Sequence, residues 1–241
     1  MLTETMIDGI RLLVDDGARE RGLLVAFSDR NGGVSGPPYD TLNLAARVGD
    51  DPDDVDENRR RVAAAAGFDP GALVLARQVH EAGVLWAGPE DSGVVGDADV
   101  LVSRTPGKVV AILSADCVPV VLEGDGVVGV VHAGWRGLVG GAIAAGLDAV
   151  GTVTRAWVGP SIHACCYEVG PEVVAAFAAT GLPVAAPDRV DPGRAAMSAL
   201  HAAGVADVEA VTECTSCDAR YFSYRRDGVT GRQGSFVGIV G

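Results

Sequence analysis

Three side chains that can bind a metal occur at equivalent places in the sequence. His80, Cys117 and His132 each follow an apolar, strand-like stretch. In open α/β sheets, ligands bind beyond the carboxyl ends of the strands, so strands running in one sense would bring these residues to one rim. Two imidazoles and a thiolate suit zinc, and three protein ligands leave a fourth position open for water. Zinc lowers the pKa of such a water to roughly 7.

The same residues permit a second chemistry. Cys117 and His132 could form a thiolate–imidazole pair of the kind found in cysteine hydrolases. Spacing does not separate this pair from a metal site, because both need the thiolate. The second histidine, His80, favours the metal, since a catalytic pair needs only one. Taken alone, a cysteine after a buried strand is typical of a small apolar core residue.

The remaining cysteines do not form a recognisable metal-binding motif. Cys214 and Cys217 make a single CxxC, and no second CxxC or HxxxH accompanies it. A closed structural zinc site is therefore not expected, and we interpret these two residues as loop thiols. The cysteine count is odd and the N-terminus lacks a secretory signal, which predicts reduced thiols and a cytoplasmic location.

Alternating apolar patterns place these residues in an α/β domain. Strands are predicted at 73–79, 109–113, 127–131 and 155–158. Helices are predicted at 55–66 (ended by Gly67), 138–149, 172–179 and 197–203. Strands interleaved with helices indicate at least some parallel pairing. We interpret 58–61 (NRRR) as an ordinary solvated helix face. With no linker to divide the chain, residues 1–241 are predicted to form a single domain of packed mixed β-sheets flanked by helices.

Bulk composition limits the possible partners. The 241 residues carry a net charge of −13, which disfavours nucleic acid because a phosphate backbone would be repelled. The longest apolar runs have the length of a strand, so no membrane span is predicted. A local basic pocket for a small anion remains compatible with this charge. We expect a monomer or weak oligomer that acts on small molecules.

Six motifs in chain order resemble the laccase-like "multicopper polyphenol oxidase" domain family. They are LNL at 42–44, QVH at 78–80, ADCVP at 115–119, HAGWRG at 132–137, GP at 159–160 with YEVG at 167–170, and FSYRRD at 222–227. The resemblance extends from about residue 24 to the C-terminus. That family also contains the bacterial peptidoglycan editing factor and purine nucleoside phosphorylases.

The resemblance implies zinc at His80, Cys117 and His132. It also implies phosphorolysis of adenosine, inosine, guanosine and methylthioadenosine, with adenosine deamination alongside. Deamination needs a carboxylate to move protons, and Asp116 is the nearest in sequence. Family motif and chemistry together suggest that Arg77, Arg136 and Arg225 clamp phosphate or ribose. On the same grounds, Asn43 and Gln78 are expected to bind polar edges of the substrate.

Other functions are compatible with the same residues. A zinc site beside arginines would also serve a hydrolase that edits a nucleotide-linked muramoyl–amino acid precursor. A non-enzymatic, zinc-holding binding protein is a further alternative, although an open three-ligand site is more than a structural role needs. A copper polyphenol oxidase is disfavoured, because clusters of several coppers need many more histidines than the four in this chain.

Overall fold

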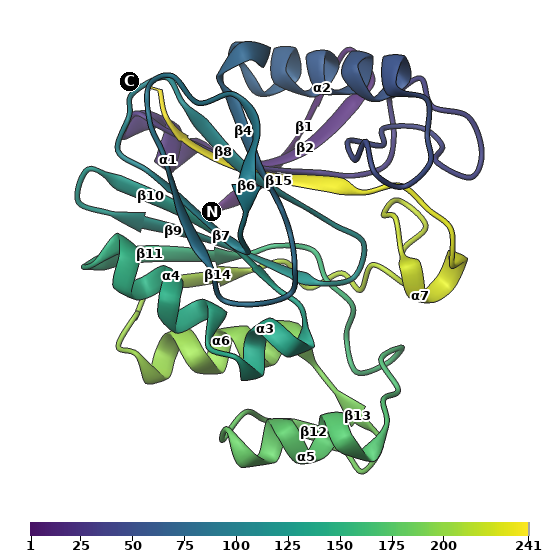
Figure 1. Ribbon diagram of the computed structural model, residues 1–241, viewed down its shortest axis with the longest axis vertical. Coiled ribbons are helices and arrows are strands. Elements are labelled where there is room, and N and C mark those ends of the chain that lie inside the picture. The colour runs from purple at the N-terminus through teal and green to yellow at the C-terminus, as the bar shows by residue number, and fades with distance from the viewer. Residues whose placement is uncertain (241) are drawn as a thin grey trace.

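Two β-sheets packed face to face form the centre of the computed structural model, which describes residues 1–240. The seven-stranded sheet has the order β1-β2-β3-β15-β8-β4-β6. Its strands are Leu2–Ile7 (β1), Ile10–Asp15 (β2), Leu23–Ser28 (β3), Gln233–Ile239 (β15), Val109–Ser114 (β8), Leu73–Arg77 (β4) and Gly93–Asp97 (β6). The N-terminal strand β1 and the C-terminal strand β15 both belong to this sheet (Figure 1), as expected if the chain forms a single domain.

The six-stranded sheet has the order β14-β11-β9-β10-β7-β5. Its strands are Val208–Ala210 (β14), Val153–Val158 (β11), Val118–Gly124 (β9), Val127–Ala133 (β10), Val100–Ser103 (β7) and Val84–Ala87 (β5). β10 is buried along its whole length and β9 nearly so, which explains why both read as continuous apolar runs instead of alternating ones. A two-stranded sheet, Val184–Ala186 (β12) with Arg189–Val190 (β13), lies apart from both.

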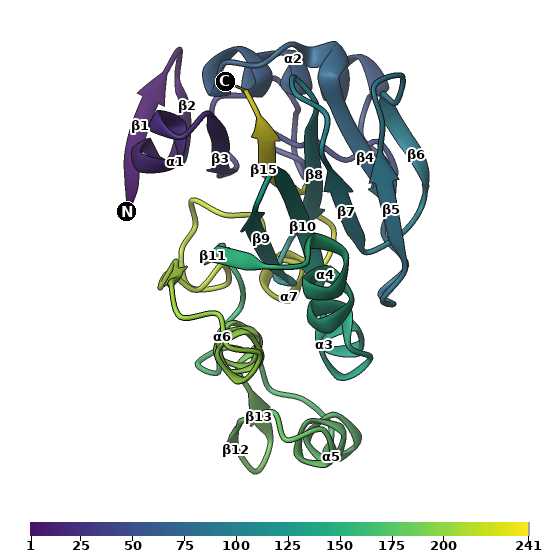
Figure 2. The same ribbon diagram turned by 90° about the vertical axis from the view of Figure 1, so that its left-hand side faces the viewer.

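Helices cover the outer faces of both sheets. The long helix Pro52–Ala66 (α2) lies on the seven-stranded sheet, while Trp135–Val139 (α3), Ala142–Val150 (α4) and Pro192–Ala202 (α6) lie on the six-stranded one (Figures 1 and 2). Pro171–Ala179 (α5) packs beside β12 and β13 at the far end of the molecule. The remaining short helices are Asp16–Glu20 (α1), Pro70–Ala72 (η1) and Tyr224–Asp227 (α7). The predicted α/β class with mixed sheets is confirmed.

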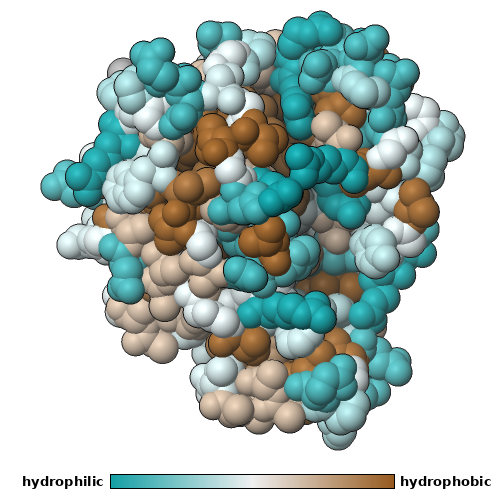
Figure 3. Space-filling model, in the orientation of Figure 1, coloured by the Kyte–Doolittle hydropathy of each residue, from teal (hydrophilic) through white to brown (hydrophobic). Residues whose placement is uncertain are grey.

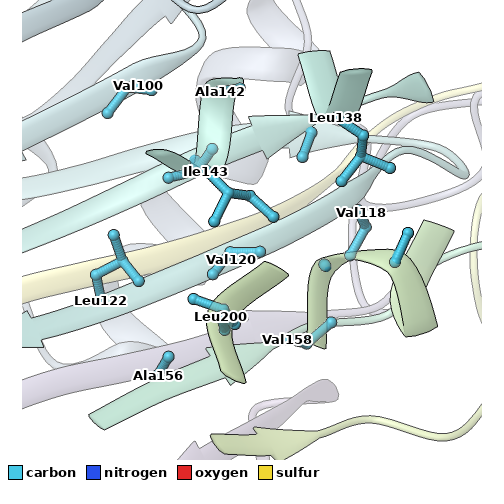
Figure 4. Packing of buried hydrophobic residues seen from close by; sticks show 14 of the residues in the cluster. Val100, Val118, Val120, Leu122, Leu138, Ala142, Ile143, Ala156, Val158 and Leu200 are labelled. Atoms are coloured by element: carbon cyan, nitrogen blue, oxygen red, sulfur yellow. The ribbon is translucent and has the colours of Figure 1, made fainter. Parts of the chain in front are cut away.

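Three apolar clusters hold the layers together. The middle cluster lies between the sheets, with Phe27 and Val110 from one facing Trp157 and Val130 from the other. On the six-stranded sheet, Leu138, Ala142, Ile143 and Leu200 of the helices pack onto strand side chains such as Val120 (Figure 4). The third cluster seats α2 on the seven-stranded sheet. Burial of apolar surface at roughly 25 cal/mol per Å² makes these contacts the main favourable contribution to folding.

Helix boundaries differ from the sequence prediction for local reasons. The helix expected at 138–149 is divided into α3 and α4, because Gly141 between them adopts φ 85°, a left-handed conformation that favours glycine. α6 begins earlier than expected, where the Asp191 carboxylate accepts a hydrogen bond from Arg194 N and Pro192 starts the helix. α2 also gains a turn at its start, capped by Asp51, and ends at Gly67 as predicted.

The strand arrangement corrects one assumption of the sequence analysis. β4 and β8 are parallel neighbours, as expected, but β10 lies in the other sheet between the antiparallel strands β9 and β7. The three strands that precede His80, Cys117 and His132 therefore do not belong to one open sheet. Apolar segments such as β3 and β15, which the sequence analysis did not assign, supply the centre of the seven-stranded sheet.

The surface mixes hydrophilic and hydrophobic side chains (Figure 3). On the face seen in Figure 3, hydrophobic side chains emerge in separate groups among hydrophilic ones instead of one continuous patch. No helix within residues 1–240 is long and apolar enough to cross a membrane.

A buried carboxylate joins the two sheets at one edge, and its loss is expected to destabilise the fold. Asp15 Oδ2 accepts from Trp157 Nε1 at 2.9 Å, and Asp15 Oδ1 accepts from Ala18 N at 2.9 Å. Asp15→Asn should lower the free energy of unfolding by about 1–3 kcal/mol, because buried donors lose a charged acceptor. Chemical denaturation checks this, with Asp16→Asn, an exposed neighbour, as the control.

The same contact predicts a pH dependence. Burial raises the pKa of Asp15, but the hydrogen bonds from Ala18 and Trp157 outweigh it and hold the pKa below its usual value. The stabilisation is therefore present above the unfolded pKa of about 4 and is lost as pH falls through the lower folded pKa. The stability difference between parent and Asp15→Asn should shrink in that range. A difference independent of pH would contradict the role of the charge.

Candidate active site

The three predicted ligands meet where the two sheets adjoin. His80 lies in the loop after β4, Cys117 in the turn between β8 and β9, and His132 near the end of β10. One ligand atom from each lies within 4.8 Å of the others, so the three form a group that could hold a metal ion. The rings of His80 and His132 lie edge to face, with centroids 4.9 Å apart and planes at 79°. Sheet packing, and not a single rim, brings them together.

A fully buried carboxylate that the sequence analysis missed holds two of the three ligands. Asp99 accepts hydrogen bonds from the backbone N–H groups of Val79, His80 and Glu81 at 2.8–3.1 Å. Its Oδ1 also lies 2.7 Å from His132 Nδ1. This contact directs the other ring nitrogen of His132 towards Cys117 and His80, the arrangement typical of metal-bound histidines. The available signal was an acidic residue directly before the apolar strand β7.

Two of the site's turns adopt uncommon backbone conformations. His80 has φ 64° and Asp116 has φ 99°, values that non-glycine residues rarely adopt and that are typical of functional sites. Asp116 is held by its own side chain: Oδ1 accepts from Thr215 Oγ1 and Oδ2 accepts from Arg225 N, both at 2.7 Å. These bonds fix the turn that presents Cys117. A side chain at position 134 would crowd Cys117, because a Cβ on Gly134 would lie 3.1 Å from Cys117 Sγ.

Electrostatics at the site favour the thiolate. Burial raises the pKa of Cys117, but His132 and His80 outweigh it and lower the pKa to about 6. Burial lowers the pKa of His132, yet Cys117 and Asp99 raise it to about 9. A thiolate with a nearby imidazolium also describes a hydrolase pair. The converging third donor, His80, favours a cation instead, and the set of two nitrogens and one sulfur fits zinc.

A cavity of about 500 Å³ opens beside the three ligands. Its volume lies within the range of small-molecule sites, roughly 300–1,000 Å³. Besides His80, Cys117 and His132, its lining combines apolar side chains with a group of cationic ones: Arg47, Arg59, Arg77 and Arg232. Burial lowers the pKa of Arg59 and of Arg232. The nearby acidic groups therefore stabilise the two positive charges less than burial destabilises them. An anionic ligand would supply the missing countercharge.

The structure places two of the five predicted substrate-binding residues in this cavity. Arg77 lines it while paired with Asp97. Gln78 lines it too, but its amide joins β4 to β8 by donating to Leu113 O at 2.7 Å and accepting from Leu113 N at 2.9 Å.

The other three predicted residues lie outside the cavity lining. Asn43 is buried, and its amide holds the 43–50 loop through Ala45 and Asp50. Arg136 lies over the Trp135 ring at 4.4 Å. Arg225 lies over the Tyr167 ring at 4.8 Å and donates to Glu168 O. The substrate contacts predicted for these residues remain predictions.

The sequence analysis missed several residues of the cavity. In the run 58–61, Arg60 and Arg61 are exposed as predicted and pair with Glu57. The prediction is wrong for Asn58, which is fully buried, and for Arg59, which turns into the cavity. Helical periodicity could have separated them. Arg232 and Tyr224 also line the cavity; Tyr224 lies within the FSYRRD motif at 222–227, whereas Arg232 belongs to none of the six motifs.

Comparison with known proteins identifies the family. The sequence pattern of the family described as multi-copper polyphenol oxidoreductase laccase matches residues 24–240. The chain belongs to this family. The several copper centres that the description names would need many more histidines than the four in this chain, two of which lie in the site.

Relatives in the family are similar along nearly the whole chain. A protein of Shigella flexneri named purine nucleoside phosphorylase YfiH is 38% identical over 243 residues, covering 95% of this chain and 99% of its own. A purine nucleoside phosphorylase of Pseudomonas aeruginosa is 41% identical over 223 residues, covering 86% and 90%. The crystal structure of YlmD from Geobacillus stearothermophilus superposes with a TM-score of 0.90 at 32% identity, covering 98% of both chains.

Replacing the buried carboxylate should weaken metal binding without unfolding the protein. Asp99→Asn leaves an amide that cannot act as a charged acceptor for both the 79–81 loop and the His132 ring. We expect zinc affinity to fall about 10- to 100-fold, as for other residues that orient metal ligands. Competition with a chromophoric chelator measures it. Asp97→Asn, two residues away and exposed, is the control and should change affinity little; an equal effect of both would contradict the proposed role.

Proposed function

We propose that this chain is a zinc-dependent purine nucleoside phosphorylase that also deaminates adenosine. The observation that supports this proposal most is that His80, Cys117 and His132 border a cavity that arginines also line. Two of these arginines, Arg59 and Arg232, are partly buried, and burial lowers the pKa of both. The names of relatives about 38% identical support phosphorolysis. Adenosine, inosine, guanosine and methylthioadenosine are the proposed nucleosides, and the cytoplasm is the proposed location. A monomer or weak oligomer is sufficient, because these site residues all come from one chain.

Phosphorolysis requires a bound dianion next to the ribose. A phosphate oxygen forms a bond to C1′ while the bond from C1′ to the purine nitrogen breaks, and the base leaves with a proton. Arginine guanidinium groups bind phosphate oxygens through paired N–H donors. Arg59 Nε donates to Leu44 O at 3.0 Å, and Arg232 Nη1 donates to Thr230 O and Gly231 O at 2.8 Å. These bonds fix both arginines, and Arg59 Nη1 also lies 3.7 Å from the exposed carboxylate of Asp56. The remaining N–H donors are available for phosphate.

The remaining residues have roles that follow from their positions. Zinc, when bound, would supply a Lewis acid and lower the pKa of a water at the site. His80, Cys117 and His132 would hold it, and Asp99 orients His132. Tyr224, exposed at the cavity, offers an aromatic face to the base. Asp116 is the nearest acid in sequence to Cys117, but both of its oxygens already accept hydrogen bonds. We therefore propose that Asp116 positions Cys117 and does not transfer protons.

Loss of any metal ligand should abolish both reactions. We expect His80→Ala, Cys117→Ala and His132→Ala to lose phosphorolysis and deamination together, because both depend on the same metal. Circular dichroism should remain close to that of the parent, since none of the three side chains belongs to an apolar cluster. His201→Ala, exposed on α6, is the control. Losses of only a few-fold in all three variants would place the chemistry at another site.

Neutralising a cavity arginine should separate the two reactions. Arg59→Gln should raise the KM for phosphate by ~30-fold or more, because losing a charged contact that leaves its partner unpaired costs about 2 kcal/mol or more. Deamination of adenosine in phosphate-free buffer should persist within about three-fold, equivalent to less than 1 kcal/mol. Arg60→Gln, one residue along α2 and exposed, is the control. Equal loss of both reactions in Arg59→Gln would show that Arg59 binds the nucleoside instead of phosphate.

A further inference from the structure

The four cysteines outside the active site come together in space. Cys165 and Cys166 lie in the loop that follows β11, and Cys214 and Cys217 lie in the loop that follows β14. Their Sγ atoms all lie within 4.8 Å of one another. The prediction that the CxxC lacks a partner pair is therefore wrong. The partner is the adjacent pair Cys165–Cys166. Two adjacent cysteines match no metal-binding motif, and only the fold brings them to the CxxC.

We propose that these four residues form a second metal site, a closed tetrathiolate centre for zinc. Zinc–sulfur bonds of about 2.3 Å in a tetrahedron place the sulfurs roughly 3.8 Å apart. Here Cys166 Sγ and Cys165 Sγ lie 3.2 and 3.5 Å from Cys217 Sγ, and every pair of the four sulfurs lies within 4.8 Å. The four sulfurs are therefore close enough together to bind one ion. Zinc binding releases four thiol protons and leaves a centre with a net charge of −2.

The surroundings of the cluster suit a negatively charged centre. The backbone N–H of His163 points at Cys214 Sγ, with nitrogen and sulfur 3.3 Å apart. Arg189 Nη1 donates to Cys165 O at 2.8 Å, and Arg225 Nη1 donates to Cys166 O at 3.2 Å. Arg226 Nη1 donates to Thr215 O at 2.9 Å, between the two cysteines of the CxxC. Three guanidinium groups thus bind the backbone of the cysteine loops and bring positive charge beside the thiolates.

Exposure argues against the cysteines acting as apolar core residues. Cys165 and Cys217 are exposed and Cys166 is half-buried, whereas Cys214 alone is buried. Four sulfurs also exceed what one disulfide uses. Zinc with all four cysteines satisfies every thiolate at once, as in other closed structural sites.

The position of the cluster gives it a role in the active site. Between Cys214 and Cys217, Thr215 donates its hydroxyl to Asp116 Oδ1, and Ile162 N on the other loop donates to Asp116 O at 3.0 Å. Asp116 directly precedes the ligand Cys117. Zinc at the cluster would thus join two loops, distant in sequence, that both support the turn presenting Cys117. The second centre is structural and positions the first.

Metal counting on the intact protein tests this proposal. Protein produced in zinc-supplemented medium should contain about one more zinc per chain than the double variant Cys214→Ser/Cys217→Ser, measured by elemental analysis. Cys117→Ser is the matched control: it should lose a different zinc, and its loss should add to that of the double variant. The count at the cluster does not depend on catalysis, so failure of the proposed function and failure of this site are distinguishable.

Thiol chemistry supplies a second measurement should the double variant not fold. In the parent protein, native alkylation followed by mass spectrometry should leave Cys165, Cys166, Cys214 and Cys217 unmodified until a chelator is added. Cys165→Ser, an exposed position, should make the other three reactive. A mass two hydrogens lighter, showing a disulfide, would overturn the proposal. Four reactive thiols in zinc-supplemented protein would overturn it equally.

Discussion

The buried carboxylate of Asp99 is the contact on which the active site depends. A fully buried charge is costly unless hydrogen bonds and opposite charge compensate for lost hydration. Asp99 receives three backbone N–H bonds from the loop after β4 and one contact from the ring of His132 on β10. Because β4 and β10 belong to different sheets, this single side chain sets the position of one sheet's ligand relative to the other's.

The packing of the two sheets provides the stability that a site with a buried charge and strained turns requires. Apolar clusters between and outside the sheets hold the strands in place without help from the polar residues. Strained turns at His80 and Asp116 can then persist, because the surrounding strands leave them no alternative conformation. The loops that carry Cys165, Cys166, Cys214 and Cys217 add to this support, because Thr215 and Ile162 on these loops donate hydrogen bonds to Asp116.

Donor chemistry is a better guide to this family than its description. The description names copper and laccase, but the site offers one thiolate and two imidazoles beside a cavity lined with arginines. Such a donor set suits zinc, and four histidines are too few for the several copper centres that the description names. Partly buried arginines are suited to an anionic co-substrate, which oxidation of a phenol does not need. The relatives' names agree with the chemistry of the site.

The sequence by itself determined the class of the fold, the family and the three side chains that could hold a metal ion. Those features depend on local patterns: apolar runs of strand length, a helix from an acidic start to Gly67, and motifs with fixed residue types. It did not determine which sheet each strand joins, because continuous apolar runs such as β9 and β10 carry no information about their neighbours.

Residues whose role depends on long-range contacts could not be predicted from the sequence for the same reason. Asp99 meets His132 across 33 positions, Arg232 reaches the cavity from the far end of the chain, and the Cys165–Cys166 pair meets its partner across about 50 residues. Only the packing of one sheet on the other brings such groups within bonding distance.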